Sequence, residues 1–168
     1  MGRVPPAREP FQLKTLRKDL GRLVEGGLFD WWILQICESR IFGLRCVRGR
    51  CTKPDAPGEE DLVKATRSLI ADAIEQIGSR QHRILLTIVF GFDERFTLED
   101  TNLQQRREAA GIHFRDGQRQ VKWGTIRQHH EPKGLDLLTE VIAGMERQAA
   151  EDGGAMLIDD TSAQSASA

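Results

Sequence analysis

The stretch EEDLVKATRSLIADAIEQI, residues 59–77, carries the most regular pattern in the chain. Its apolar residues recur every three or four positions, a spacing that places them on one face of a helix. They are Leu62, Ala65, Leu69, Ile70, Ala73, Ile74 and Ile77. Three acidic residues open the segment, where the helix dipole favours negative charge. The segment therefore predicts an amphipathic helix that ends at Gly78.

Upstream of this segment the helical spacing recurs. Apolar residues of the segment 11–28 fall on one helical face, and the glycine pair at 26–27 supplies a stop signal. A second, short helix is predicted over 30–39, with Asp30 as its N-cap. The segment 41–47 is apolar but too short to be assigned to helix or strand.

Downstream, the apolar run 80–92 fits either a buried strand or a buried helix. We predict a helix, because no second strong strand exists to pair with it. A capping box of Thr101 and Gln104 then predicts a helix that ends near residue 110. A second capping box, Thr125 with Gln128, starts a helix that is interrupted or kinked at Pro132 and continues to about residue 145.

Between these two helices, Asp116–Gly117 suits a two-residue hairpin turn. Such a turn would pair Ile112 with Val121 and Phe114 with Arg119. The fold class is therefore mostly α, a helical bundle with a C-terminal helix-turn-helix-like unit and at most one small β-hairpin.

The chain is expected to divide into an arm, a domain and a tail. The proline-rich residues 1–10 predict a flexible arm, and the small polar residues of 149–168 predict a disordered tail. Residues 11–148 form a single helical domain. It has an N-terminal helical part, 11–92, and a helix-turn-helix-like part, 93–148.

Composition excludes several classes of protein. Aromatic residues make up only 6% of the 168 residues and tyrosine is absent, which argues against a large β-sandwich or an aromatic stacking platform. An odd number of cysteines, three, argues against a secreted disulfide framework. The longest apolar run is far too short for a bilayer, and no signal peptide is recognised. We expect a cytoplasmic protein without membrane contact.

No catalytic motif is recognised in the chain. It lacks a phosphate-binding glycine-rich loop, a nucleophile elbow and a dinucleotide fingerprint. We therefore expect no enzyme activity and no cofactor. Thiolates bind zinc well, but no two of Cys37, Cys46 and Cys51 form a Cys-x-x-Cys pair, so we predict no metal site. The alternative is a zinc site of these three cysteines, with His82 or His113 as its conceivable fourth ligand.

Charge is spread unevenly along the chain. Residues 103–134 hold seven lysines and arginines against three acidic residues, whereas residues 135–168 hold one against seven. This pattern fits either ordinary helix surfaces or one anion-binding face with acidic elements packed behind it.

The basic segment 103–134 has the order of a helix-turn-helix, in which the second helix enters the major groove. Arginine and glutamine pair with base edges, and arginine or lysine contacts phosphate. The predicted contacts to double-stranded DNA are Arg106, Arg107, Arg115, Arg119, Lys122, Arg127 and Gln128. The connector 111–124 is longer than a compact turn, so either a hairpin is inserted or the helices are arranged in another way.

The alternative function is a helical adaptor without nucleic-acid contact. Adjacent tryptophans at Trp31 and Trp32 would mark its partner surface, together with the acidic helix 59–77. Its partner would be another protein or a second copy of the chain.

A family resemblance adds to the DNA-binding interpretation. The strings LLTIVFGFDERFTLED (85–100), RREAAGIHF (106–114), GTIRQHHEP (124–132) and LDLLTEVI (135–142) resemble uncharacterised helical modules common in actinomycete proteins. Such modules are usually regarded as helix-turn-helix-like, with a winged-helix-like variant. The resemblance implies a role in transcription regulation or protein interaction and implies no chemistry.

Overall fold

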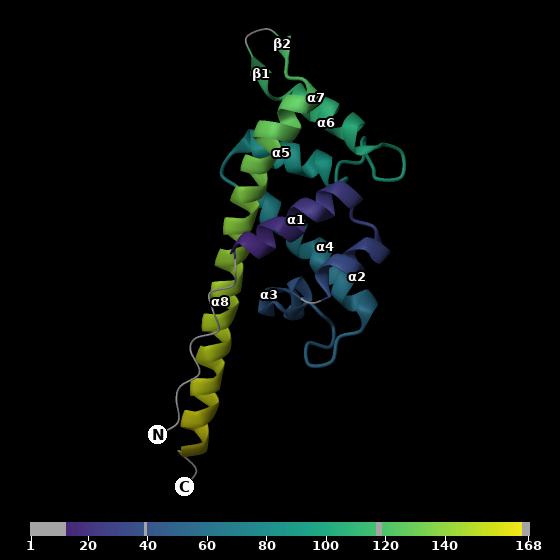
Figure 1. Ribbon diagram of the computed structural model, residues 1–168. Helices are drawn as coiled ribbons and strands as arrows, with labels where there is room; N and C mark the ends of the chain where they lie inside the picture. The colour runs from purple at the N-terminus through teal and green to yellow at the C-terminus, as the bar shows by residue number, and fades with distance from the viewer. Residues whose placement is uncertain (1–12, 39, 117–118, 166–168) are drawn as a thin grey trace.

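The computed structural model describes residues 13–38, 40–116 and 119–165 and shows a mainly helical body (Figure 1). The mostly-α prediction is confirmed. The predicted arm, residues 1–10, lies outside the described residues.

The helices are joined by connections of different lengths, the longer ones at residues 49–58 and 90–102. In chain order they are α1 (Leu13–Gly26), α2 (Asp30–Cys37), α3 (Arg45–Arg48), α4 (Glu59–Glu75), α5 (Arg80–Val89), α6 (Leu103–Gly111), α7 (Trp123–Thr125) and α8 (Glu131–Ser165). A 3-10 turn, η1 (Ile41–Gly43), precedes α3, and a π turn, η2 (Ile126–His130), joins α7 to α8. The ambiguous segment 41–47 is thus helical, and the apolar run 80–92 forms α5 as predicted.

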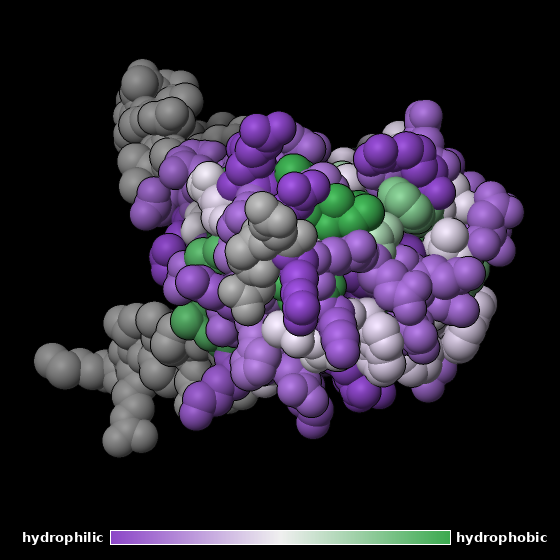
Figure 2. Space-filling model, turned by 90° about the horizontal axis from the view of Figure 1, so that it is seen from above, coloured by the Kyte–Doolittle hydropathy of each residue, from purple (hydrophilic) through white to green (hydrophobic). Residues whose placement is uncertain are grey.

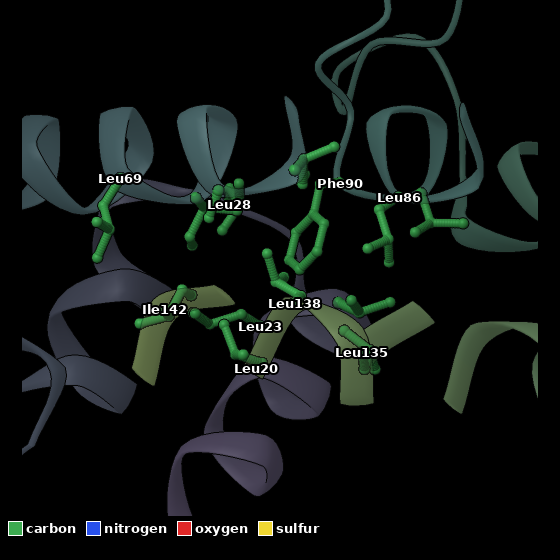
Figure 3. Close-up of a cluster of buried hydrophobic side chains, with 14 of the residues drawn as sticks. Leu20, Leu23, Leu28, Leu69, Leu86, Phe90, Leu135, Leu138 and Ile142 are labelled. Atoms are coloured by element: carbon green, nitrogen blue, oxygen red, sulfur yellow. The ribbon is translucent and has the colours of Figure 1, made fainter. Parts of the chain in front are cut away.

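The long helix α8 runs along one side of the body, and α1, α3, α4 and α5 all contact it (Figure 1). Its apolar stripe of Leu135, Leu138 and Ile142 enters the core (Figure 3). There it meets Leu20 and Leu23 of α1 from one side and side chains of α4 and α5 from the other. Each such leucine contributes about 1.5–3 kcal/mol relative to an exposed one, so α8 binds the other helices into one core.

Two of the predicted N-caps lie one residue from their true positions. α2 begins after Phe29, and the Asp30 carboxylate instead pairs with Arg67 of α4. The capping box of α6 is formed by Asn102 and Gln105, with N–H···O distances of 2.8 and 2.9 Å, rather than by Thr101 and Gln104. The hydroxyl of Thr101 donates to a backbone carbonyl of the preceding loop, so it is not free to cap the helix.

The predicted capping box at Thr125 is wrong. The helix already begins at Trp123, with Lys122 as its N-cap, and Thr125 lies inside it. At the predicted kink the chain forms the π turn η2, where the N–H of Glu131 bonds to the carbonyl of Ile126. Pro132 lacks an N–H and its ring crowds the preceding turn, so the wider π turn lets the helix continue without a break.

A two-stranded hairpin connects α6 to α7 in place of a compact turn. β1 (Arg115–Asp116) pairs antiparallel with β2 (Arg119–Gln120), and Arg115 lies opposite Gln120. The predicted register, which pairs Phe114 with Arg119, is therefore wrong, because Arg119 lies opposite Asp116. The hairpin stands at one end of the body beside α6 and α7 (Figure 1).

The tail also differs from expectation. α8 continues to Ser165, so residues 149–165 are helical where a disordered tail was predicted. Extending an existing helix adds one hydrogen bond for each residue fixed, without a new nucleation step. The last part of α8 extends past the other helices (Figure 1).

Gly111, the last residue of α6, brings the hairpin against the helix. The N–H of Val121 bonds to the Gly111 carbonyl over 3.3 Å. A Cβ on Gly111 would lie only 2.1 Å from the backbone oxygen of Val121. Only glycine allows this approach without moving the backbone.

Replacing Gly111 by alanine is therefore expected to lower the free energy of unfolding by about 1–3 kcal/mol, as overpacking does. Gly124→Ala is the matched control, because a Cβ there meets nothing within 4 Å and alanine favours a helix by about 0.5–1 kcal/mol. Urea denaturation of both variants measures the difference. Equal stability of the two would contradict the close packing of α6 on the hairpin.

Candidate nucleic-acid interface

Arg107, predicted to contact DNA, lies inside the protein and is only 4% exposed. Its guanidinium donates from Nε and Nη2 to the two carboxylate oxygens of Glu131, over 2.8 and 2.7 Å. Nη2 also reaches Glu25 of α1 over 3.0 Å. One side chain of α6 thus joins α8 and α1, and its burial keeps it away from a phosphate on the surface.

Arg106 is buried to the same extent. It donates from Nε to the carbonyl of Val89 over 3.1 Å and from Nη1 to the carbonyl of Thr101 over 2.7 Å. Burial, and then the neighbouring charge of Arg107, lower the pKa of Arg106. Both arginines are therefore structural, and their assignment as DNA contacts is wrong.

The remaining predicted DNA contacts are exposed. Arg115 and Arg119 lie on the hairpin, Lys122 precedes α7, and Arg127 and Gln128 lie on the π turn. Figure 2 views the molecule from above, onto the end that carries the hairpin in Figure 1. Hydrophilic residues cover most of this face, with hydrophobic residues in small patches.

A hollow of about 530 Å³ lies between the hairpin and the start of the long helix. We call it the hairpin hollow. Arg115, Arg119 and Lys122 line it together with His130, and no acidic residue is among the described residues that do so. Gln81, at the start of α5, closes another side and donates to the carbonyl of His113 over 3.2 Å. The hairpin hollow therefore attracts anions.

Arg127 faces a different hollow, of about 370 Å³, which we call the α1 hollow. Arg17, Lys18 and Arg22 of α1 line it as well. Its two acidic residues, Glu25 and Glu131, both bond to Arg107. Basic residues thus lie on both sides of the segment 122–132, and the α1 residues were missed because nothing in the sequence brings α1 to this segment.

Aromatic rings pack together beside the hairpin hollow. The ring of Phe114 lies 4.2 Å from that of His130 and 5.5 Å from that of His82, between centroids. Burial first, and then nearby positive groups, lower the pKa of both histidines. The sequence marks His82 only as a conceivable metal ligand, and nothing in it brings these three rings together.

The tryptophan pair is only partly accessible. Trp31 is 62% exposed, whereas Trp32 is half-buried and donates from Nε1 to the carbonyl of Arg22 over 2.8 Å. The two rings meet edge to face at 5.5 Å. Trp32 therefore fastens α2 to α1, and only Trp31 presents its ring to solvent.

The cysteines are far from thiolate form. Burial is the main cause that raises the pKa of Cys37 and of Cys46 to about 12. Within the described part of the chain, no three His, Cys, Asp or Glu residues gather as metal ligands would. None of the described helices combines the length and the apolar character needed to cross a membrane.

Comparison of the chain with protein-family models, curated proteins and solved structures finds no match. The candidate interface is therefore argued from the geometry of its residues alone.

The contribution of the Arg107–Glu131 pair to stability can be tested by removing one partner and then both. Arg107→Met leaves a buried carboxylate without a partner, which is expected to cost about 3–5 kcal/mol of unfolding free energy. Glu25→Gln acts on the same guanidinium, but Glu25 is 56% exposed, so the loss should stay under about 1 kcal/mol. Urea denaturation measures both variants.

The double variant Arg107→Met/Glu131→Leu removes both charges and should recover most of the lost stability, because apolar pairs of similar volume replace buried ion pairs well. A single Arg107→Met variant as stable as Glu25→Gln would show that the pair does not hold these helices.

Proposed function

We propose that this protein binds double-stranded DNA and acts in regulation. The contacting surface is the hairpin β1–β2 with the helix start at 122–130. The observation that carries the proposal is the hairpin hollow, lined by three exposed cations and, among its described residues, by no acid. Cations that gather without acidic neighbours match the charge of a phosphate backbone.

The shape of this end supports the proposal. A major groove about 12 Å wide admits either an α-helix or a two-stranded ribbon, and both elements are present here. Arg115 and Arg119 lie on the ribbon, and Arg127 and Gln128 lie on the helix start. The hairpin separates α6 from α7, which is one of the two arrangements that the long connector 111–124 leaves open.

The proposed DNA-contacting residues fall into two groups, those that contact phosphates and those that contact bases. Arg115, Arg119 and Lys122 surround the hairpin hollow and suit phosphate contacts, which position the protein on the duplex. Gln128 is exposed on the π turn beside Arg127, and these two side-chain types read base edges. Lys18 and Arg22, exposed at the α1 hollow, extend the phosphate-contacting surface.

Salt dependence tests the proposal most directly. Contacts from Arg115, Arg119, Lys122, Lys18 and Arg22 to five phosphates would give a log–log slope of affinity against salt of about −4.5. The double variant Arg115→Gln/Arg119→Gln should weaken binding to every duplex sequence and reduce the slope to about −2.7. Fluorescence anisotropy with a labelled duplex, at several salt concentrations, measures both.

Lys53→Gln/Lys64→Gln is the matched control. It removes the same charge from exposed positions in the loop before α4 and on α4, away from the hairpin end (Figure 1). The control should keep the parent slope. Equal slopes for the two double variants, or no duplex binding at low salt, would contradict the proposal.

A second candidate function is protein docking through Trp31. Its exposed ring and that of Phe29, 36% exposed, are among the few large apolar side chains that reach solvent in the described residues. Docking predicts self-association or capture of a partner protein that Trp31→Ala abolishes. Unchanged duplex binding by Trp31→Ala would separate the two functions.

A further inference from the structure

His130 is the one titratable ring that lines the hairpin hollow among its described residues. It is the last residue of the π turn and is half-buried, with its ring against Phe114. No hydrogen bond to this ring is found among the described residues. The ring is therefore held by packing alone, and its nitrogens are available to a ligand in the hollow.

Among the described residues, the ionisable groups found beside His130, apart from Glu131, are basic. His129 and Lys133 lie on its own helix, and His82 approaches from α5. Arg115 and Arg119 of the hairpin, with Lys122, line the same hollow. The adjacent acid, Glu131, points to Arg107 and is bonded by it at both oxygens.

This surrounding lowers the pKa of His130, through burial first and then through His129 and Lys133. Protonation of the ring is therefore disfavoured in the free protein, although the ring lines a hollow of basic residues. An anion in the hollow would change that balance, because an opposite charge nearby favours the protonated ring.

We propose that the hairpin hollow receives a phosphate group of the bound duplex and that His130 takes up a proton from solvent as the phosphate enters. The proposal rests on the proposed function and adds proton linkage to it. The protonated ring then donates a charge-assisted N–H···O bond to the phosphate.

The direction of the linkage follows from the two states of His130. Its pKa is lower in the free protein than in the complex, so binding takes up a proton at any pH that lies between these two pKa values. Affinity for the duplex therefore rises as pH falls through the bound-state pKa and becomes constant below the free-state pKa.

His82 limits the uptake to one proton. Its Nδ1 lies 2.6 Å from the hydroxyl of Ser79, while its buried Nε2 has no hydrogen-bond partner among the described residues. It packs on Phe114 and does not line the hollow. A charged His130 disfavours a second charge on His82, because the two repel each other.

The test uses the full chain, a short duplex and inorganic phosphate as separate probes. Proton NMR of the imidazole rings should show the pKa of His130 rising by about one unit when either probe is added. Duplex affinity at constant low salt should rise as the pH falls, by up to about tenfold once the pH lies below the free-state pKa, to match that shift. His130→Gln should remove most of this rise.

His129→Gln is the control, since His129 is the exposed neighbour outside the hollow. It should keep the size of the pH dependence, with the midpoint moved to higher pH, because His129 no longer lowers the pKa of His130. Arg119→Gln provides a second variant that leaves the imidazole in place, and it should reduce the rise of the His130 pKa on adding inorganic phosphate.

The two proposals fail differently. If the parent protein binds no duplex at any pH, the proposed function fails, and the phosphate titration still decides whether His130 responds to an anion. If the duplex binds and His130→Gln keeps the full pH dependence, or if phosphate leaves the pKa of His130 unchanged, the inference about His130 is overturned.

Discussion

The buried pair of Arg107 and Glu131 is the interaction on which the hairpin end depends. Arg107 comes from the middle of α6, and Glu131 is the first residue of α8, directly after the π turn. Their two-pronged bond ties the helix before the hairpin to the helix after it. Such a pair adds little net stability compared with apolar residues, but losing one partner is costly. Its main effect is to fix how α6 and α8 meet.

The junction of α6 and α8 also decides which basic residues remain accessible to solvent. With Arg106 and Arg107 turned inward, the exposed positive charge of the segment 103–134 comes from the hairpin, from the helix start and from Lys133. Gly111 lets the hairpin lie against the end of α6, and the π turn carries Arg127 and His130 into two separate hollows. The exposed basic residues of a short ribbon are thus held by a helical frame, an arrangement that many binding loops share.

The helical architecture could be predicted because apolar periodicity is a local property of the chain. The stripe of residues 59–77 and the glycine stop after 26 need no knowledge of distant partners, and both appear in the structure. Helix caps were less predictable. Thr101 and Asn102 are both competent caps, and only the loop carbonyl that accepts from Thr101 decides between them.

The roles of the arginines could not be predicted, for a physical reason. Arg106 and Arg107 lie in a short helix with few apolar residues, and such a segment usually faces water. Their partners are 17 and 24 residues further away in the chain, at Val89 and Glu131. A sequence does not show which carboxylates are buried, so structural and ligand-contacting arginines look alike in it.

The most direct test of this account follows arginine side chains and backbone amides together by NMR while a duplex is added. The account predicts that amide signals of residues 113–130 shift, while the Nε–H signals of Arg106 and Arg107 remain sharp and unmoved. Shifts of those two Nε–H signals with an unchanged hairpin would contradict it, because they would mean that the buried arginines open to meet the ligand.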